Sequence, residues 1–129
     1  MTTLLPLREL VGYRSGDKGD LVNVAIFADD DEVYELILRE ATAERVKAHF
    51  GWMVEGDVDR YEARNVLALN FVLHGALGGG GTRTLRSDNL GKSMGGTLVR
   101  MAIPVPDHLA TRRRPRPDVT WAKEILDAL

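Results

Sequence analysis

The sequence contains no cysteine, and this absence excludes disulfide bonds, thiolate metal sites and cysteine nucleophiles. It has no apolar run long enough to cross a bilayer. Its first ten residues, MTTLLPLREL, lack the basic start and the long apolar core of a signal peptide. Its 129 residues are enough to bury a core without metals or disulfides. We therefore expect a soluble cytoplasmic protein with no membrane partner.

The net charge of −2 conceals an uneven distribution, with an acidic segment at residues 29–62 and a basic one at residues 83–117. Most of the basic excess lies in the run RRRPRP at residues 112–117. This run is broken by proline and contains no aromatic residue on which a base could stack. It is typical of a solvated tail or a subunit contact, and no nucleic-acid partner is expected.

Hydrophobic spacing predicts a mixture of strands and helices. The alternating or β-branched stretches predict strands at residues 5–14, 20–28, 57–63 and 98–106. Helical spacing predicts helices at residues 29–41, 42–50, 66–77 and 121–129. Thr42 is expected to cap the second helix, which should stop at Gly51. Asn65 is expected to cap the third, a buried helix because VLALNFVLHGAL is apolar on almost every side.

These elements predict an α+β fold in which an antiparallel sheet carries helices on one face. The ferredoxin-like sandwich is the leading candidate among such folds. Residues 1–106 should form the domain, and residues 107–129 an Arg/Pro-rich tail with a flexible joint and a short terminal helix.

Two motif matches are judged misleading. The tripeptide Gly91-Lys92-Ser93 matches the end of a phosphate-binding P-loop, but the required earlier glycine is replaced by Arg86. The same segment matches the G-x-S-x-G elbow of hydrolases, which needs a large parallel sheet that this chain lacks. His74 is interpreted as a core residue of the predicted buried helix, and no metal site is expected.

The segment RSGDKGD at residues 14–20 is the strongest candidate for a site, and we expect it at the turn between the first two strands. It combines two cations, two carboxylates and two glycines that free the backbone to turn. Loops that gather amides and a cation in this way bind phosphate or carboxylate. The alternative is a structural staple, in which Arg14 pairs with Asp17 or Asp20. The residues alone favour neither reading.

A family resemblance adds to this reading. The strings RSGDKGDxxN, RYEARNVLALNFVL, the glycines after HGAL, and LRSDNLGKS occur in that order over about residues 8–105. Together they resemble the C-terminal domain of the acyclic terpene utilisation protein AtuA family. The resemblance implies a ferredoxin fold and a module that usually follows a much larger N-terminal domain. That family is associated with breakdown of acyclic terpenoids through coenzyme A thioesters.

The resemblance also singles out residues by position. It includes Asp17 and Asp20, whose carboxylates make them candidate proton carriers, but it supplies no reaction itself. It implies as ligand-binding candidates Arg14, Ser15, Lys18, Asn23, Gly78, Gly79, Gly80, Asp88 and Lys92. Asn65 and Asn70 match as well, whereas Gly95-Gly96 departs from the helix formers expected there. We expect the three polar motifs to cluster, with Lys18 or Arg14 near Asp88 or the glycine amides, in a pocket that takes an anion.

Two functions follow from this reading. The first is a non-catalytic subunit or interaction partner of a larger acyl-CoA or terpenoid-catabolic protein. The second is an enzyme subunit at a partner interface, where Arg14, Lys18 and Lys92 hold a coenzyme A phosphate or a carboxylate. The expected partners are a second copy of the chain or a large AtuA-like N-terminal-type protein, with an acyl-CoA or another anionic small molecule as ligand. No cofactor is expected.

Overall fold

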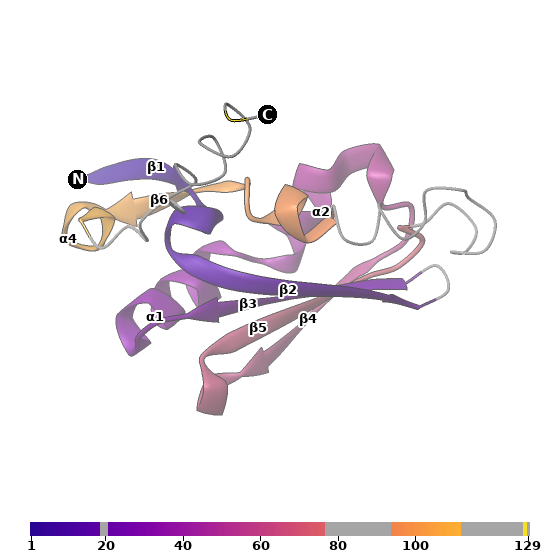
Figure 1. The fold of residues 1–129 in the computed structure, drawn as a ribbon, viewed down its shortest axis with the longest axis horizontal. Coiled ribbons are helices and arrows are strands. Elements are labelled where there is room, and N and C mark those ends of the chain that lie inside the picture. The colour runs from indigo at the N-terminus through magenta and orange to yellow at the C-terminus, as the bar shows by residue number, and fades with distance from the viewer. Residues whose placement is uncertain (19–20, 77–93, 112–127, 129) are drawn as a thin grey trace.

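The computed structural model describes residues 1–18, 21–76, 94–111 and 128 of the chain (Figure 1). In chain order the elements are β1 Thr2–Pro6, η1 Leu7–Glu9, β2 Val11–Lys18, β3 Leu21–Ala28, α1 Asp31–Glu40, α2 Ala43–Phe50, η2 Gly51–Met53, β4 Val58–Ala63, η3 Arg64–Val66, β5 Ala68–Leu73, β6 Ala102–Pro106 and α4 Asp107–Ala110. A further short helix spans residues 94–98. Within the described residues, no helix has the length and apolar character needed to span a membrane.

Four strands form an antiparallel sheet in the order β2-β3-β5-β4. It consists of two hairpins that join where β3 pairs with β5. A separate ribbon pairs β1 with β6, also antiparallel, and Figure 1 shows it on one side of the larger sheet. The expected α+β fold with antiparallel strands is therefore confirmed.

One face of the larger sheet supplies the core. On β3, Val22, Val24 and Ile26 are fully buried, and on β5 so are Leu69, Phe71 and Leu73. Alternation along a strand sends these residues to one side of the sheet, where they meet the apolar sides of the helices. The helices contribute Val33, Tyr34, Leu36, Ile37, Val46 and Phe50 to this cluster. None of the described helices covers the opposite side of the sheet, which is called the open face below.

The first two helices begin and end as their sequences predict. The Asp30 side chain accepts a hydrogen bond from the Val33 amide at 2.9 Å, which caps α1. Thr42 caps α2 in the same way through the Arg45 amide at 3.2 Å. Gly51 ends α2 with a positive φ of 59°, a conformation that glycine adopts without steric cost.

The predicted helix at residues 66–77 is wrong, because this segment contains the central strand β5. Its residues are apolar on both faces: Leu69 and Phe71 point to the core, and Val72 on the other side is half-buried. A short apolar run of this kind does not distinguish a buried helix from a buried strand. Asn65 lies in η3 rather than at a helix cap, and Leu67 follows in a left-handed conformation that ends this turn.

Two predicted strands are shorter than expected. Residues 5–14 divide into the end of β1, η1 and the start of β2, and β1 and β2 belong to different sheets. In η1 the Leu7 amide bonds to the Met101 carbonyl at 3.0 Å and the Arg8 amide to Val99 at 2.8 Å, which turns the chain between the sheets. At the other end, β6 begins only at Ala102, although Val99 and Met101 are buried as their alternation predicts.

The predicted domain boundary at residue 106 falls directly before α4. Leu109 of α4 is 4% exposed and belongs to the core. His108 of the same helix lies 3.2 Å from a Glu32 carboxylate oxygen of α1. Residues 107–110 are therefore part of the packed domain rather than a joint. The rest of the predicted tail, except for residues 111 and 128, lies outside the described residues.

Candidate functional site

The RSGDKGD motif lies at the end of the β2–β3 hairpin, as expected, but most of it belongs to the strand rather than to the turn. Residues 14–18 belong to β2, where they pair with residues 21–25 of β3. Strand pairing here continues through the charged residues because the partner strand is strongly β-forming and its buried face anchors the register. Of Asp17 and Lys18 only the strand backbone is described, and Gly19 and Asp20 lie outside the described residues.

Because successive strand residues point to opposite faces, the motif is divided between two environments. Arg14 and Gly16 stand opposite Ala25 and Asn23, on the open face. Ser15 stands opposite buried Val24 and lies on the side of the core. Arg14 is exposed, whereas Ser15 is half-buried. These two candidate residues therefore do not converge on one ligand.

Ser15 packs against the short helix at residues 94–98. A Cβ atom placed on Gly95 would lie 2.9 Å from Ser15 Oγ and 2.9 Å from Tyr13 Cδ2, closer than side-chain atoms normally approach. Only glycine allows this helix to lie so close to β2. The departure from the family pattern at Gly95 thus has a packing reason, and the segment is helical despite it.

Asn23 makes the most direct link between two of the matched motifs. Its Nδ2 donates to Asn70 Oδ1 at 3.4 Å, which joins the first motif on β3 to the second on β5. Its Oδ1 lies 3.1 Å from the position that a Cβ of Gly16 would occupy. Gly16 therefore leaves room on the open face for the Asn23 carboxamide to lie across β2.

The open face includes the Lys18–Leu21 pair at the end of β2 and β3, and three rows that cross all four strands. The register gives the rows as Gly12, Phe27, Ala68, Ala63; Arg14, Ala25, Asn70, Tyr61; and Gly16, Asn23, Val72, Asp59. Among the positions of the three rows only Arg14 and Asp59 carry a charge. Tyr61 is 55% exposed, and Phe27 and Val72 are half-buried.

An aspartate–histidine pair at the edge of this face was not predicted from the sequence. His74 Nε2 lies 2.8 Å from Asp59 Oδ2, and the two side chains are 40% and 47% exposed. The predicted core role of His74 is therefore wrong. The available signal was the alternation Ala68, Asn70, Val72, His74, which places His74 on the outer face once the segment is read as a strand.

The sequence matches the family model described as the AtuA ferredoxin-like domain over residues 5–104. The chain belongs to this family. The match runs from β1 into β6 and confirms the resemblance drawn from the motifs. No curated protein and no solved structure matches the chain.

In this AtuA ferredoxin-like domain, the described segments on either side of residues 77–93 lie near the motif strand β2 and its partner β3. Val22 pairs with Leu73, so β5 ends beside the start of β3. On the other side of residues 77–93, Gly95 packs against Ser15. Gly78, Gly79, Gly80, Asp88 and Lys92 themselves lie outside the described residues, as does Asp20. The expected clustering of the three motifs stays a prediction.

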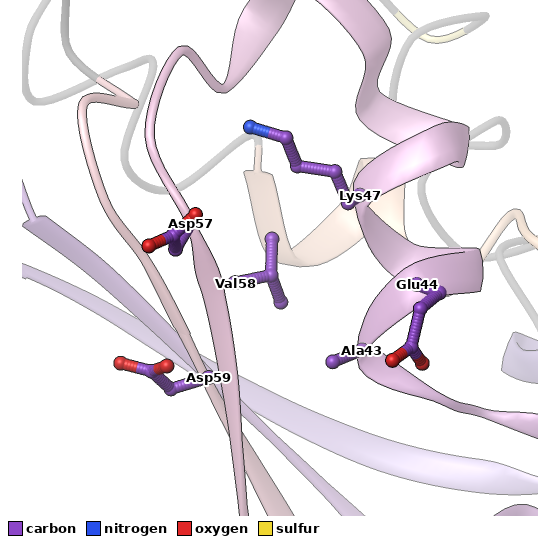
Figure 2. Close-up of a pocket in the computed structure, with 6 residues that line it drawn as sticks. All are labelled: Ala43, Glu44, Lys47, Asp57, Val58 and Asp59. Carbon is purple, nitrogen blue, oxygen red and sulfur yellow. The ribbon is translucent and has the colours of Figure 1, made fainter.

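A hollow of about 290 Å³ separates α2 from β4 in the AtuA ferredoxin-like domain, and its charged lining does not converge (Figure 2). Lys47 Nζ donates to the Val54 carbonyl at 3.1 Å and to the Gly56 carbonyl, so its charge holds the chain before β4. Figure 2 shows Val58 directed toward α2 and the Asp59 carboxylate on the other side of the strand. Within the parts of the chain that the structure describes, no three His, Asp or Glu side chains are grouped to hold a metal ion.

Proposed function

We propose that this AtuA ferredoxin-like domain is a non-catalytic interaction module that binds a larger protein of acyl-CoA or terpenoid catabolism through its open face. The family resemblance supports a module that accompanies a larger domain. The composition of the open face is the observation that carries the proposal.

A sheet face that only meets water normally carries alternating polar and charged side chains. The three rows of this open face instead combine Arg14 and Asp59 with aromatic, aliphatic and carboxamide side chains. Depletion of charge together with tyrosine and arginine is the composition that distinguishes the centre of a protein interface. Since the other face of the sheet is filled by the core, the open face is the sheet surface that the described residues leave for a partner.

The test is recovery of the partner from extract of the source organism with the tagged full chain. A protein that contains the large N-terminal-type domain should co-purify with the wild type. Tyr61→Ser should lower its recovery about fivefold or more, because truncating a tyrosine that anchors an interface costs more than about 1 kcal/mol of binding.

Trp52→Ser is the matched control, since Trp52 is an aromatic residue 87% exposed on η2 and outside the three rows. Recovery with this variant should equal that of the wild type. Equal recovery with Tyr61→Ser, or recovery of no protein of the expected class, would refute the open face as the binding surface.

The Asp59–His74 pair supports a second candidate, an enzyme subunit that supplies acid–base chemistry at the partner interface. A carboxylate that holds one ring nitrogen of a histidine leaves the other to exchange a proton with a substrate. Arg14 on the same face would attract an anionic group. The discriminating measurement is turnover of acyl-CoA compounds by the complex: His74→Gln abolishes it for an enzyme subunit and leaves it unchanged for the module.

A further inference from the structure

The strand β4 lies at one end of the four-stranded sheet, and one of its two edges is unpaired. It is joined to β5, and among the described residues no strand pairs with its other edge. The opposite end of the sheet differs, because the helix at residues 94–98 packs against Ser15 of β2. An unpaired edge exposes a row of amides and carbonyls to which another strand can bind.

A hydrogen bond at the end of β5 shows which backbone groups of β4 face the unpaired edge. The His74 amide donates to the Asp57 carbonyl at 3.0 Å, and these two residues extend the β4–β5 register by one pair. Bonded and non-bonded pairs alternate along an antiparallel ladder. Tyr61 therefore directs its amide and carbonyl to β5, whereas Arg60 and Glu62 direct theirs to the unpaired edge.

The other edge of β5 gives the same assignment independently. The Ala28 amide donates to the Leu67 carbonyl at 2.9 Å, in line with the β3–β5 register. Successive residues of a strand direct their backbone groups to opposite edges. Since Leu67 faces β3, Asn70, three residues later, faces β4, where it stands opposite Tyr61.

The sequence of β4 lacks the residues that commonly prevent pairing at an edge. Natural edge strands often carry proline or lysine, which block or repel a further strand. The sequence of β4, VDRYEA, contains neither. The ribbon strands contrast with it, because β1 ends in Pro6 and β6 contains Pro104 and Pro106. Among the described strands, β4 therefore has the edge best suited to accept another strand.

This edge is complementary to a second copy of itself in one antiparallel register. With Tyr61 opposite Tyr61 of the second copy, Arg60 stands opposite Glu62, and Glu62 opposite Arg60. These residues carry the unpaired amides and carbonyls, so each pair exchanges two hydrogen bonds and brings opposite charges together. Within one chain, Arg60 Nη2 and Glu62 Oε2 are 3.7 Å apart. Directly opposite residues on adjacent strands are closer than residues two apart on one strand, so the pairing between copies is the tighter one.

The neighbouring registers are unfavourable. A shift by one residue aligns backbone groups that already bond to β5, because only every second residue of β4 faces the edge. A shift by two residues places Arg60 opposite Arg60 in one direction and Glu62 opposite Glu62 in the other. Like charges directly opposite each other destabilise a strand pair. The sequence of β4 thus specifies a single register.

We propose that two copies of the chain pair through β4 about a twofold axis at Tyr61, which joins their four-stranded sheets into one continuous antiparallel sheet. Tyr61 is 55% exposed and lies on the open face. Across the axis it forms a non-hydrogen-bonded pair with its counterpart, the arrangement in which side chains approach most closely and two aromatic rings stabilise each other. This assembly goes beyond the proposed function, because it concerns the edge of the sheet and a second copy of the chain.

The absence of cysteine from the chain allows a direct test of the register by cross-linking. Tyr61→Cys places two thiols opposite each other at a Cα separation of about 4.5 Å, within disulfide range, so mild oxidation should give a covalent dimer. Ala63→Cys is the matched control on the same face of β4. Residue 63 would lie about 13 Å along the strand from its counterpart, beyond disulfide reach. Equal cross-linking of the two variants, or no cross-linking of Tyr61→Cys, would overturn the register.

Sedimentation equilibrium of the full chain tests the pairing itself. One added strand is a small interface, so half of the wild-type chains should be dimeric at a concentration below about 1 mM. Glu62→Lys places a cation opposite Arg60 of each copy and should weaken dimerisation about tenfold or more.

Glu32→Lys is the control for this charge reversal, since the Glu32 side chain on α1 is 53% exposed and that of Glu62 is 56% exposed. It should dimerise like the wild type. A wild type that stays monomeric up to about 1 mM, or a Glu62→Lys variant that dimerises as well as the wild type, would refute the proposal. Circular dichroism of each variant verifies that it is folded.

Discussion

The contact between Gly95 and β2 allows a sharp test of the packing around the motif. A Cβ atom on residue 95 would lie 2.9 Å from Ser15 Oγ and 3.0 Å from Ser15 Cβ. Tyr13, whose ring is 2.9 Å away, is 45% exposed and can swing toward solvent. Ser15 Cβ is fixed to the strand backbone, so relief of that contact requires the helix at residues 94–98 to move.

The expected effect of Gly95→Ala is the sum of two opposing terms. Overpacking of this kind costs about 1–3 kcal/mol, whereas replacing glycine by alanine in a helix contributes up to about 1 kcal/mol of stability. The free energy of unfolding should therefore fall by about 0–3 kcal/mol. The neighbouring Gly96→Ala is the matched control, because its Cβ would meet only Tyr13 Oη, at 3.7 Å. Gly96→Ala should therefore gain the stability of alanine in a helix without the cost of overpacking.

Urea unfolding followed by circular dichroism measures both variants. We expect Gly95→Ala to be less stable than Gly96→Ala by about 1–3 kcal/mol. Ser15→Gly removes the opposing Cβ and Oγ, so Gly95→Ala should cost less in that background, and the double-mutant cycle should show coupling. If Gly95→Ala is as stable as Gly96→Ala, the close approach of the helix to Ser15 is not a real constraint and the reasoning fails.

Two further predictions concern single side chains. Arg60 Nη1 donates to the Leu38 and Ala41 carbonyls at 2.8 and 3.0 Å. Arg60→Met should therefore lower the free energy of unfolding by about 1–3 kcal/mol in urea titrations. Arg64→Met removes an exposed ion pair with Glu35 and should change that free energy by less than about 1 kcal/mol. Lys18→Ala should reduce recovery of the partner while changing the free energy of unfolding by less than about 0.5 kcal/mol; a variant that unfolds instead identifies a structural staple.

Local signals were sufficient to predict the first two helices. Asp30 and Thr42 are short polar residues directly before a stretch with helical spacing. The side-chain oxygen of each accepts a hydrogen bond from the backbone amide three residues later. Gly51 stands where α2 ends. Capping depends on neighbours within one turn of the chain, so a single sequence contains what is needed to place these ends.

The segment at residues 66–77 shows where local signals are insufficient. Whether an apolar run becomes a helix or a strand depends on which partners cover its two sides. Here β3 and β4 pair with it on both edges, with Val24 opposite Phe71 and Arg60 on the other side. These partner residues belong to other segments of the chain, and no spacing within residues 66–77 records them. Predicting a helix at residues 66–77 also hid the Asp59–His74 pair. His74 is placed beside Asp59 of β4 only when its own segment is a strand that pairs with β4.

The motif RSGDKGD was read as a turn for a related reason. Glycine and charge are typical of turns, but on an edge strand they have other uses. Gly16 makes room for the Asn23 carboxamide, and Ser15 receives the helix that approaches at Gly95. Arg14 on the opposite face is exposed, in the row that contains Asn70 and Tyr61. One strand can therefore be a structural contact through Ser15 and an accessible surface through Arg14. For this reason the effects of Ser15 substitutions should appear in stability, and those of Arg14 substitutions in partner binding.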